Sequence, residues 1–175
     1  VLSPGDRVFL AGRPDAVREA AGIMSLATKQ PKYAIILGCG EMGLPIARAL
    51  EARGIRLTVF ESNRERALAV AEVLTKALVV NDEGMSENVL RGNRIEDADL
   101  FIATTGNDSL NLLGSLQAKR LGAKRTFAMQ ERAEFSDTVE AAGVDVVIRP
   151  RRLTASAVLR HLRTGKVMSS TILDR

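Results

Sequence analysis

Short apolar runs alternate with longer amphipathic stretches through the centre of the chain. The apolar runs are typical of parallel strands that are covered on both faces; they lie at 34–37, 56–60, 77–80, 99–104, 125–129 and 145–148. The amphipathic stretches have helical spacing and lie at 42–53, 65–74, 87–90, 107–121 and 135–142. This alternation predicts an α/β fold, a Rossmann-like doubly wound parallel sheet of about six strands with right-handed crossovers.

Glycines and composition changes mark where these elements and the central domain end. Gly54, Gly122 and Gly143 stand where helices should stop, which suits a left-handed residue just after each helix. Residues 33–150 hold the alternating unit. The remaining segments fall outside it: a turn, strand and short helix at 1–24, a polar linker at 25–32, and a helix followed by one more strand at 151–175. We expect a piece of a longer protein.

The first predicted strand runs directly into residues 38–43, which have the sequence GCGEMG and open a helix. In this G-x-G-x-x-G pattern Gly38 allows the tight turn, Gly40 lets the backbone approach a pyrophosphate, and Gly43 lets the helix pack against the strand. The helix N-terminus adds free N–H groups and a partial positive charge. The segment therefore predicts a diphosphate site; the alternative is a glycine-rich turn without a ligand.

An acidic residue follows the second predicted strand. Glu61 lies 23 residues after Gly38, near the ~20-residue offset of a carboxylate that binds the adenosine ribose. Such a carboxylate accepts hydrogen bonds from both ribose hydroxyls and repels a 2′-phosphate, which favours NAD or NADH over NADP. Arg64 and Arg66 leave this choice open, because an arginine could accept a 2′-phosphate.

Polar residues follow the third and fourth predicted strands. Asp82 is placed to receive the adenine amino group, or else to cap a helix. Thr104, Thr105 and Gly106 lie where the strand order of such a sheet reverses, and we expect them to face the second ribose and the nicotinamide. Asn107 shares this segment, and either it or the next residue could cap the following helix.

Composition and charge narrow the classes of partner. Residues 1–32 hold five basic and three acidic residues, residues 33–148 hold thirteen and seventeen, and residues 149–175 hold seven and one. The acidic body and an aromatic content of 3% argue against a nucleic-acid binder. Apolar runs of about five residues are far shorter than a membrane span. We expect a cytoplasmic protein without direct membrane insertion; the basic end is a solvated helix or a partner interface, or it contacts RNA or anionic lipid.

The sequence offers no group for hydride-transfer catalysis. Tyr33 is the only tyrosine and has Leu37, not lysine, four residues later; His161 is the only histidine and lies in the terminal helix. Cys39, the only cysteine, lies inside the glycine loop. With one cysteine and one histidine, a cysteine-based metal cluster and a multi-histidine metal site within one chain are excluded as well. A cofactor site without an acid–base group predicts a sensor, in which the nucleotide biases conformation, and not an enzyme.

Four segments together resemble the KTN domain, also called the RCK N-terminal or TrkA-N domain, over about residues 33–150. They are the glycine motif with its acidic partner, the Asn-Asp turn after the third strand, ADLFIATTGNDSLN at 98–111 and GVDVVIRP at 143–150. The third segment is far more specific than the glycine motif. Residues 1–24 are similar to the C-terminal end of a preceding TrkA-C (RCK-C) domain. Residues 151–175 are similar to the linking helix and the start of a following TrkA-C domain. This domain order is found in duplicated TrkA proteins.

The resemblance implies a cytoplasmic regulatory subunit on the inner face of the cell membrane, which docks on a membrane potassium channel or transporter and changes its gating. It also implies a homodimer or higher homo-oligomer that binds NAD or NADH, with ATP, ADP or AMP as further candidates. By position, the family's site would contain Gly38, Cys39, Gly40, Glu41, Met42, Gly43, Glu61, Asp82, Thr104, Thr105, Gly106 and Asn107.

The sequence departs from the family at Met129, where an arginine that reaches the ligand phosphates is often found. Weaker binding or another ligand preference would follow. Three alternatives stay open: the cofactor-binding domain of an NAD-dependent dehydrogenase, a KTN module of another potassium efflux or antiport system, and a scaffold that retains the fold only for dimer packing.

Overall fold

The computed structural model describes residues 30–132 and 142–150, together with Ala16. Contacts divide the chain into residues 1–30 and 31–175, and the second unit contains the sheet described below. The expected flanking pieces at 1–24 and 151–175 and the expected helix at 135–142 fall, apart from Ala16 and residue 142, outside the described residues.

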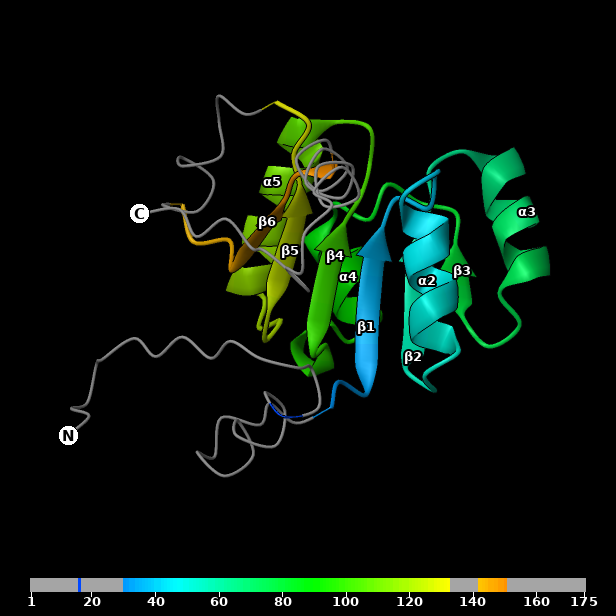
Figure 1. The fold of residues 1–175 in the computed structure, drawn as a ribbon. Coiled ribbons are helices and arrows are strands. Elements are labelled where there is room, and N and C mark those ends of the chain that lie inside the picture. The colour runs from blue at the N-terminus through cyan, green and yellow to red at the C-terminus, as the bar shows by residue number, and fades with distance from the viewer. Residues whose placement is uncertain (1–15, 17–29, 133–141, 151–175) are drawn as a thin grey trace, which may run out of the picture. The chain divides into compact units, whose positions relative to one another are not determined.

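Six parallel strands form one sheet in the order β3-β2-β1-β4-β5-β6 (Figure 1). The chain builds the sheet outward from β1 to β3 and then crosses to the other side of β1 to begin β4. The carboxyl ends of β1 and β4 are therefore the point at which such a sheet binds its ligands. This arrangement confirms the predicted fold class. The strands are Tyr33–Leu37 (β1), Arg56–Phe60 (β2), Leu78–Val80 (β3), Leu100–Ala103 (β4), Thr126–Met129 (β5) and Val146–Ile148 (β6).

The helices that connect the strands agree with the predicted ranges to within a few residues. The three predicted end-glycines, Gly54, Gly122 and Gly143, have φ of 76°, 108° and 106°. Within the described ranges, no helix has the length and apolar character that a membrane crossing needs. The helices are Gly43–Glu51 (α2), Arg64–Val73 (α3), Glu87–Gly92 (α4) and Asp108–Arg120 (α5), with a short 3-10 turn at Ile95–Asp97 (η1) that the pattern did not predict.

The central strand contributes to two cores because successive side chains of a strand point to opposite faces. Tyr33, Ile35 and Leu37 belong to one buried cluster, which residues of α4 and α5 complete. Ala34 and Ile36 belong to the other, which residues of α2 and α3 complete. In Figure 1 these helix pairs lie on opposite sides of the sheet. An unbroken apolar run is therefore the pattern that a doubly covered strand requires.

Asp99 holds the amino ends of the central strands together. Its Oδ2 accepts hydrogen bonds from the backbone N–H groups of Lys32 and Tyr33, at 2.7 and 3.1 Å. Its Oδ1 pairs with Nζ of Lys124 at 2.6 Å. The hydrogen bond from Lys124 and the two from the backbone lower the pKa of Asp99 to about 2. This anchor fixes the start of β1 beside β4, and so helps to place the loop at the other end of β1.

Candidate ligand-binding site

The glycine loop between β1 and α2 turns sharply, and two of its positions leave no room for a side chain. Gly38 has φ of +84°, and a Cβ there would lie 2.8 Å from Cγ2 of Thr105. A Cβ at Gly43 would lie 2.2 Å from the carbonyl oxygen of Gly38 and 2.8 Å from Oγ1 of Thr104. The first turn of α2 therefore packs directly on the loop and on the end of β4, as the motif predicts.

Gly40 has the opposite environment. A Cβ at this position would meet no atom within 4 Å, and the residue lines a cavity. Met42 is the N-cap of α2 and gives no side-chain capping bond, whereas Asn63 and Asn107 cap α3 and α5 in that way. No side chain caps the first turn of α2, where the N–H of Leu44 donates to the carbonyl oxygen of Gly40 at 3.0 Å, and the positive end of the helix dipole at this point suits an anion. A diphosphate fits this arrangement.

The cavity lies where β1, β2, β4 and β5 end, and its volume is about 460 Å³. This is within the range of small-molecule sites. It contains most of the residues that the sequence analysis assigned to a nucleotide: Gly38, Gly40, Glu41, Met42, Glu61, Thr104, Thr105 and Gly106. The remaining lining residues are Ser62, Arg66, Met129 and Glu131.

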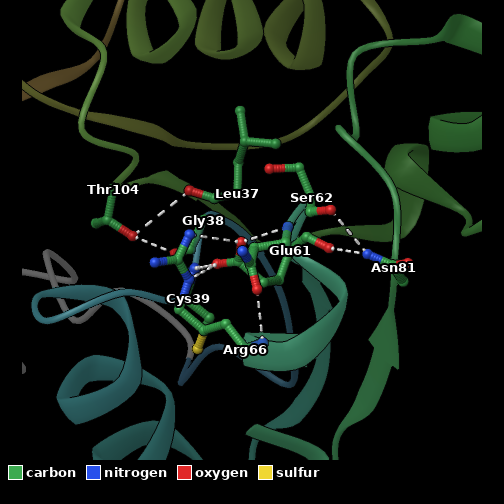
Figure 2. A network of polar contacts seen from close by, with 9 residues as sticks. Leu37, Gly38, Cys39, Glu61, Ser62, Arg66, Asn81 and Thr104 are labelled. Atoms are coloured by element: carbon green, nitrogen blue, oxygen red, sulfur yellow. Dashed lines mark hydrogen bonds and ion pairs between the residues drawn. The ribbon is translucent and has the colours of Figure 1, made fainter. Parts of the chain in front are cut away.

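The carboxylate of Glu61 is only 3% exposed and is bonded through both oxygens. Oε2 accepts from the N–H of Cys39 at 3.0 Å and lies 3.1 Å from Nε of Arg66. Oε1 accepts from the N–H of Asn63 at 2.9 Å and from Nη2 of Arg66 at 3.1 Å (Figure 2). Burial raises the pKa of Glu61, but the bonds from Arg66 and the two N–H groups outweigh it, so the pKa is lowered. At neutral pH the pair is therefore a carboxylate and a guanidinium.

The residues that directly follow β3 and β4 hold neighbouring strand ends together around the cavity (Figure 2). Nδ2 of Asn81 donates to the carbonyl oxygens of Glu61 and Ser62, at 2.8 and 3.0 Å. Oγ1 of Thr104 donates to the carbonyl oxygen of Gly38 at 2.8 Å. These bonds join the ends of β2 and β3 on one side and the ends of β1 and β4 on the other.

Asn111 organises the opposite wall from α5, where its side chain is fully buried. Oδ1 accepts from the N–H and from Oγ1 of Thr105, at 2.9 and 2.7 Å. Nδ2 donates to the carbonyl oxygens of Thr105 and Met129, at 3.0 and 2.9 Å. All the hydrogen-bonding positions of the amide are used. Asn111 thereby fixes the loop after β4 against the end of β5, and so positions two lining residues.

The TrkA-N domain family matches residues 34–150. The chain belongs to that family. This confirms the resemblance that the sequence motifs indicated, and the matched range covers the sheet from the second residue of β1 onward and every residue that lines the cavity.

Curated relatives of this TrkA-N chain are Trk system potassium uptake proteins. The TrkA homolog 1 of Methanosarcina mazei is 31% identical over 175 residues, which is 99% of this chain and 43% of the relative. TrkA of Azorhizobium caulinodans is 34% identical over 168 residues, which is 95% of this chain and 37% of the relative. The chain thus spans less than half the length of these relatives.

Two solved structures show the same fold. The TrkA-N domain of the inner membrane protein ybaL from Escherichia coli has a TM-score of 0.66 at 21% identity and covers 78% of this chain and 100% of that one. The GsuK channel bound to NAD has a TM-score of 0.64 at 21% identity and covers 82% of this chain and 27% of the channel chain.

Two predicted residues of the TrkA-N glycine motif support the cavity without lining it. The thiol of Cys39 is buried, while its backbone N–H donates to the carboxylate of Glu61. Burial and, to a smaller extent, Glu61 raise the pKa of the Cys39 thiol to about 11. Gly43 lies beneath the loop, against Gly38 and Thr104. Their contribution to the site is therefore made through the backbone.

Two further predicted residues lie outside the cavity. Oδ1 of Asp82 accepts from the N–H of Gly84 at 2.7 Å in the turn after β3. The N-cap of α4 is Ser86, so the alternative in which Asp82 caps a helix is wrong; a contact with adenine stays a prediction. Asn107 is the N-cap of α5, where Oδ1 accepts from two N–H groups of the first turn, which confirms the capping alternative.

The sequence analysis missed Ser62 and Glu131 as lining residues. No motif marks them, but each follows the end of a strand, and that position was the available signal. Met129 does line the cavity and is 4% exposed, so an apolar side chain stands where the family often has arginine. Among the described lining residues Arg66 is the one cation, beside three glutamates, and it pairs with Glu61.

Proposed function

We propose that this TrkA-N domain binds NAD or NADH in the cavity beside the glycine loop and acts as the nucleotide-sensing part of a regulatory subunit of a potassium uptake system. The observation that carries the proposal is the contrast within the loop: Gly38 and Gly43 are closed to any side chain, whereas Gly40 opens on the cavity. The closed positions allow the tight turn and the close packing of α2, and the open position lets a diphosphate approach the backbone.

Different residues of the cavity bind the different parts of the dinucleotide. The loop at residues 38–42 holds the diphosphate at the N-terminus of α2, where the helix dipole favours its negative charge. Glu61 holds the adenosine ribose, and the residues Thr104–Gly106 face the distal half of the dinucleotide. Because the ligand contacts α2 on one side and the loop after β4 on the other, it links the two halves of the sheet across the switch point.

The candidate acid–base groups favour a regulatory role over hydride-transfer chemistry. The hydroxyl of Tyr33 lies at the amino end of β1, 2.6 Å from the carbonyl oxygen of Asn93 and 2.9 Å from Oγ1 of Thr58. The hydroxyl therefore makes structural hydrogen bonds at the end of β1 that is remote from the glycine loop. The raised pKa of the Cys39 thiol, about 11, keeps that group protonated at neutral pH.

The names of the relatives support the remainder of the proposal. They are Trk system potassium uptake proteins, and one structure of the same fold is a channel bound to NAD. We infer a homo-oligomer that docks on a membrane potassium channel or transporter at the inner face of the cell membrane. The same reasoning extends to residues 1–24 and 151–175 as parts of flanking TrkA-C domains, on either side of the domain at 33–150.

Calorimetric titration with NADH, NAD and ADP tests the proposal. We expect Glu61→Gln to weaken NADH binding by about 10- to 100-fold, since hydrogen bonds to a charged group are worth about 1.5–3 kcal/mol. Glu65→Gln is the matched control, because Glu65 is exposed on α3 and does not line the cavity. Failure of the parent chain to bind any of the three ligands at millimolar concentration would refute the proposal. Turnover of NAD with a hydroxy acid would favour a dehydrogenase.

A further inference from the structure

The carboxylate of Glu61 has no acceptor position left for a ribose. Its two oxygens offer about four lone-pair sites, and these are taken by two backbone N–H groups and by two nitrogens of Arg66. A ribose diol that bonds this carboxylate therefore needs one of the present donors to leave.

Of the present donors, Arg66 is the one that can leave at low cost. The N–H groups of Cys39 and Asn63 belong to the glycine loop and to the N-cap of α3, so they cannot move without the elements that they begin. The side chain of Arg66 is 52% exposed and projects from α3, where rotation about its own bonds releases it. Its guanidinium regains water when it rotates away, and the ribose hydroxyls take the acceptor positions that it leaves, so the buried carboxylate is not left unpaired.

We propose that Arg66 determines ligand specificity at the sugar end of the site, an inference that rests on the proposed function. Arg66 competes with the ribose hydroxyls for Glu61, and it offers a cation to a ligand that carries a 2′-phosphate. A lone ionised glutamate at this position repels that phosphate. When Glu61 is paired with Arg66, the pair carries no net charge, so the electrostatic repulsion that would exclude NADPH is removed.

The geometry of the pair supports both parts of this proposal. Arg66 binds the carboxylate through Nε and Nη2, and within the described part of the chain its Nη1 has no hydrogen-bond partner. The guanidinium lines the same cavity as Ser62, which follows Glu61 in the loop after β2. A fork of this kind can exchange a carboxylate for a phosphate, because each presents two charged oxygen acceptors that the guanidinium N–H groups can bond side by side.

Titrations of NADH and NADPH into the parent chain and Arg66→Gln separate this role from a structural one. In the parent we expect the two affinities to lie within about tenfold of each other. In Arg66→Gln we expect NADH to bind about three- to tenfold more tightly and NADPH about tenfold more weakly. Arg64→Gln is the matched control: Arg64 is exposed on the same helix and does not line the cavity, so the ratio should not change.

A second variant tests the reason for the gain. If NADH binds Arg66→Gln more tightly because Glu61 has been freed, then the same change in a Glu61→Gln background should give no gain. Equal weakening of both nucleotides in Arg66→Gln, or an unchanged ratio of their affinities, would overturn the inference while leaving the proposed function intact. If the parent chain binds neither NADH nor NADPH, the inference fails, and the proposed function fails with it if NAD and ADP do not bind either.

Discussion

Replacing Gly43 by alanine adds one methyl group where the structure has no space for it. The new Cβ would lie 2.2 Å from the carbonyl oxygen of Gly38 and 2.8 Å from Oγ1 of Thr104. Neither atom moves easily, because the first belongs to the backbone of the loop and the second is a hydroxyl that already bonds that carbonyl at 2.8 Å. The start of α2 must therefore move away from β1 and β4.

The expected cost combines three effects. Overpacking a tight site costs about 1–3 kcal/mol, and loss of the bond from Thr104 to Gly38 costs about 1 kcal/mol. Alanine recovers about 0.4–1 kcal/mol because it restricts the unfolded chain more than glycine does. The net effect is a lower free energy of unfolding by about 2 kcal/mol, which for a chain of this size lowers Tm by roughly 4–8 °C.

Thermal and urea unfolding followed by circular dichroism measure this effect, and Gly40→Ala is the matched control. The chemical change is the same, but a Cβ at Gly40 meets no atom within 4 Å, so Tm should stay within about 2 °C of the parent. Because the methyl group of Gly40→Ala stands in the cavity, this variant should lose NADH affinity while keeping its stability. The pair thus separates the packing role of the loop from its binding role.

Two results would refute this reasoning. A Gly43→Ala variant that unfolds at the temperature of the parent would show that contact between α2 and the loop does not constrain the fold. A Gly40→Ala variant that binds NADH as the parent does would show that the open backbone at this position is not the diphosphate cradle.

Three further predictions concern one residue at the amino end of the sheet and two that support the cavity. The hydrogen bond from Lys124 and two from the backbone lower the pKa of Asp99 to about 2. The stability that this carboxylate contributes is therefore present above its unfolded pKa of about 3.9 and is lost as the pH falls toward 2. In urea titrations Asp99→Asn should flatten the pH dependence of the free energy of unfolding between these values, and an unchanged slope would contradict the assignment. Asn111→Ala should lower the free energy of unfolding by about 2–4 kcal/mol and weaken NADH binding, because it leaves the N–H of Thr105 without its buried partner; parent-like unfolding and titration curves would argue against it. The thiol of Cys39, 1% exposed and with a pKa raised to about 11, should not react with a thiol reagent at pH 7.5 until the protein unfolds, and rapid labelling of the folded chain would disprove this.

The order and type of the main elements were predictable from the sequence because they depend on local patterns. The second strand was predicted at 56–60 and is found at Arg56–Phe60. Unbroken apolar runs are required wherever a strand is covered on both faces, and glycine is favoured wherever φ is positive, as at Gly54 and Gly122. The short turn η1 escaped prediction because three residues are too few to show a period.

The cavity was predictable in outline for a different reason. In a doubly wound sheet, residues that directly follow the strands meet at one edge whatever their side chains. The glycine motif, Glu61 and the segment after β4 were therefore expected together, and most of their residues line one cavity. Asp82 follows a strand as well, but its side chain is used by its own turn, a local competition that spacing does not reveal.

The sequence by itself thus determined the strand–helix order and the edge of the sheet at which polar residues gather, since both follow from periodicity and chain direction. Only the tertiary structure decided which side chains share hydrogen bonds there. Glu61 bonds the N–H of Cys39, 22 positions away, and Asn111 bonds the carbonyl oxygen of Met129, 18 positions away. Such pairs depend on ångström-scale distances between segments that are remote along the chain, and no local pattern contains those distances.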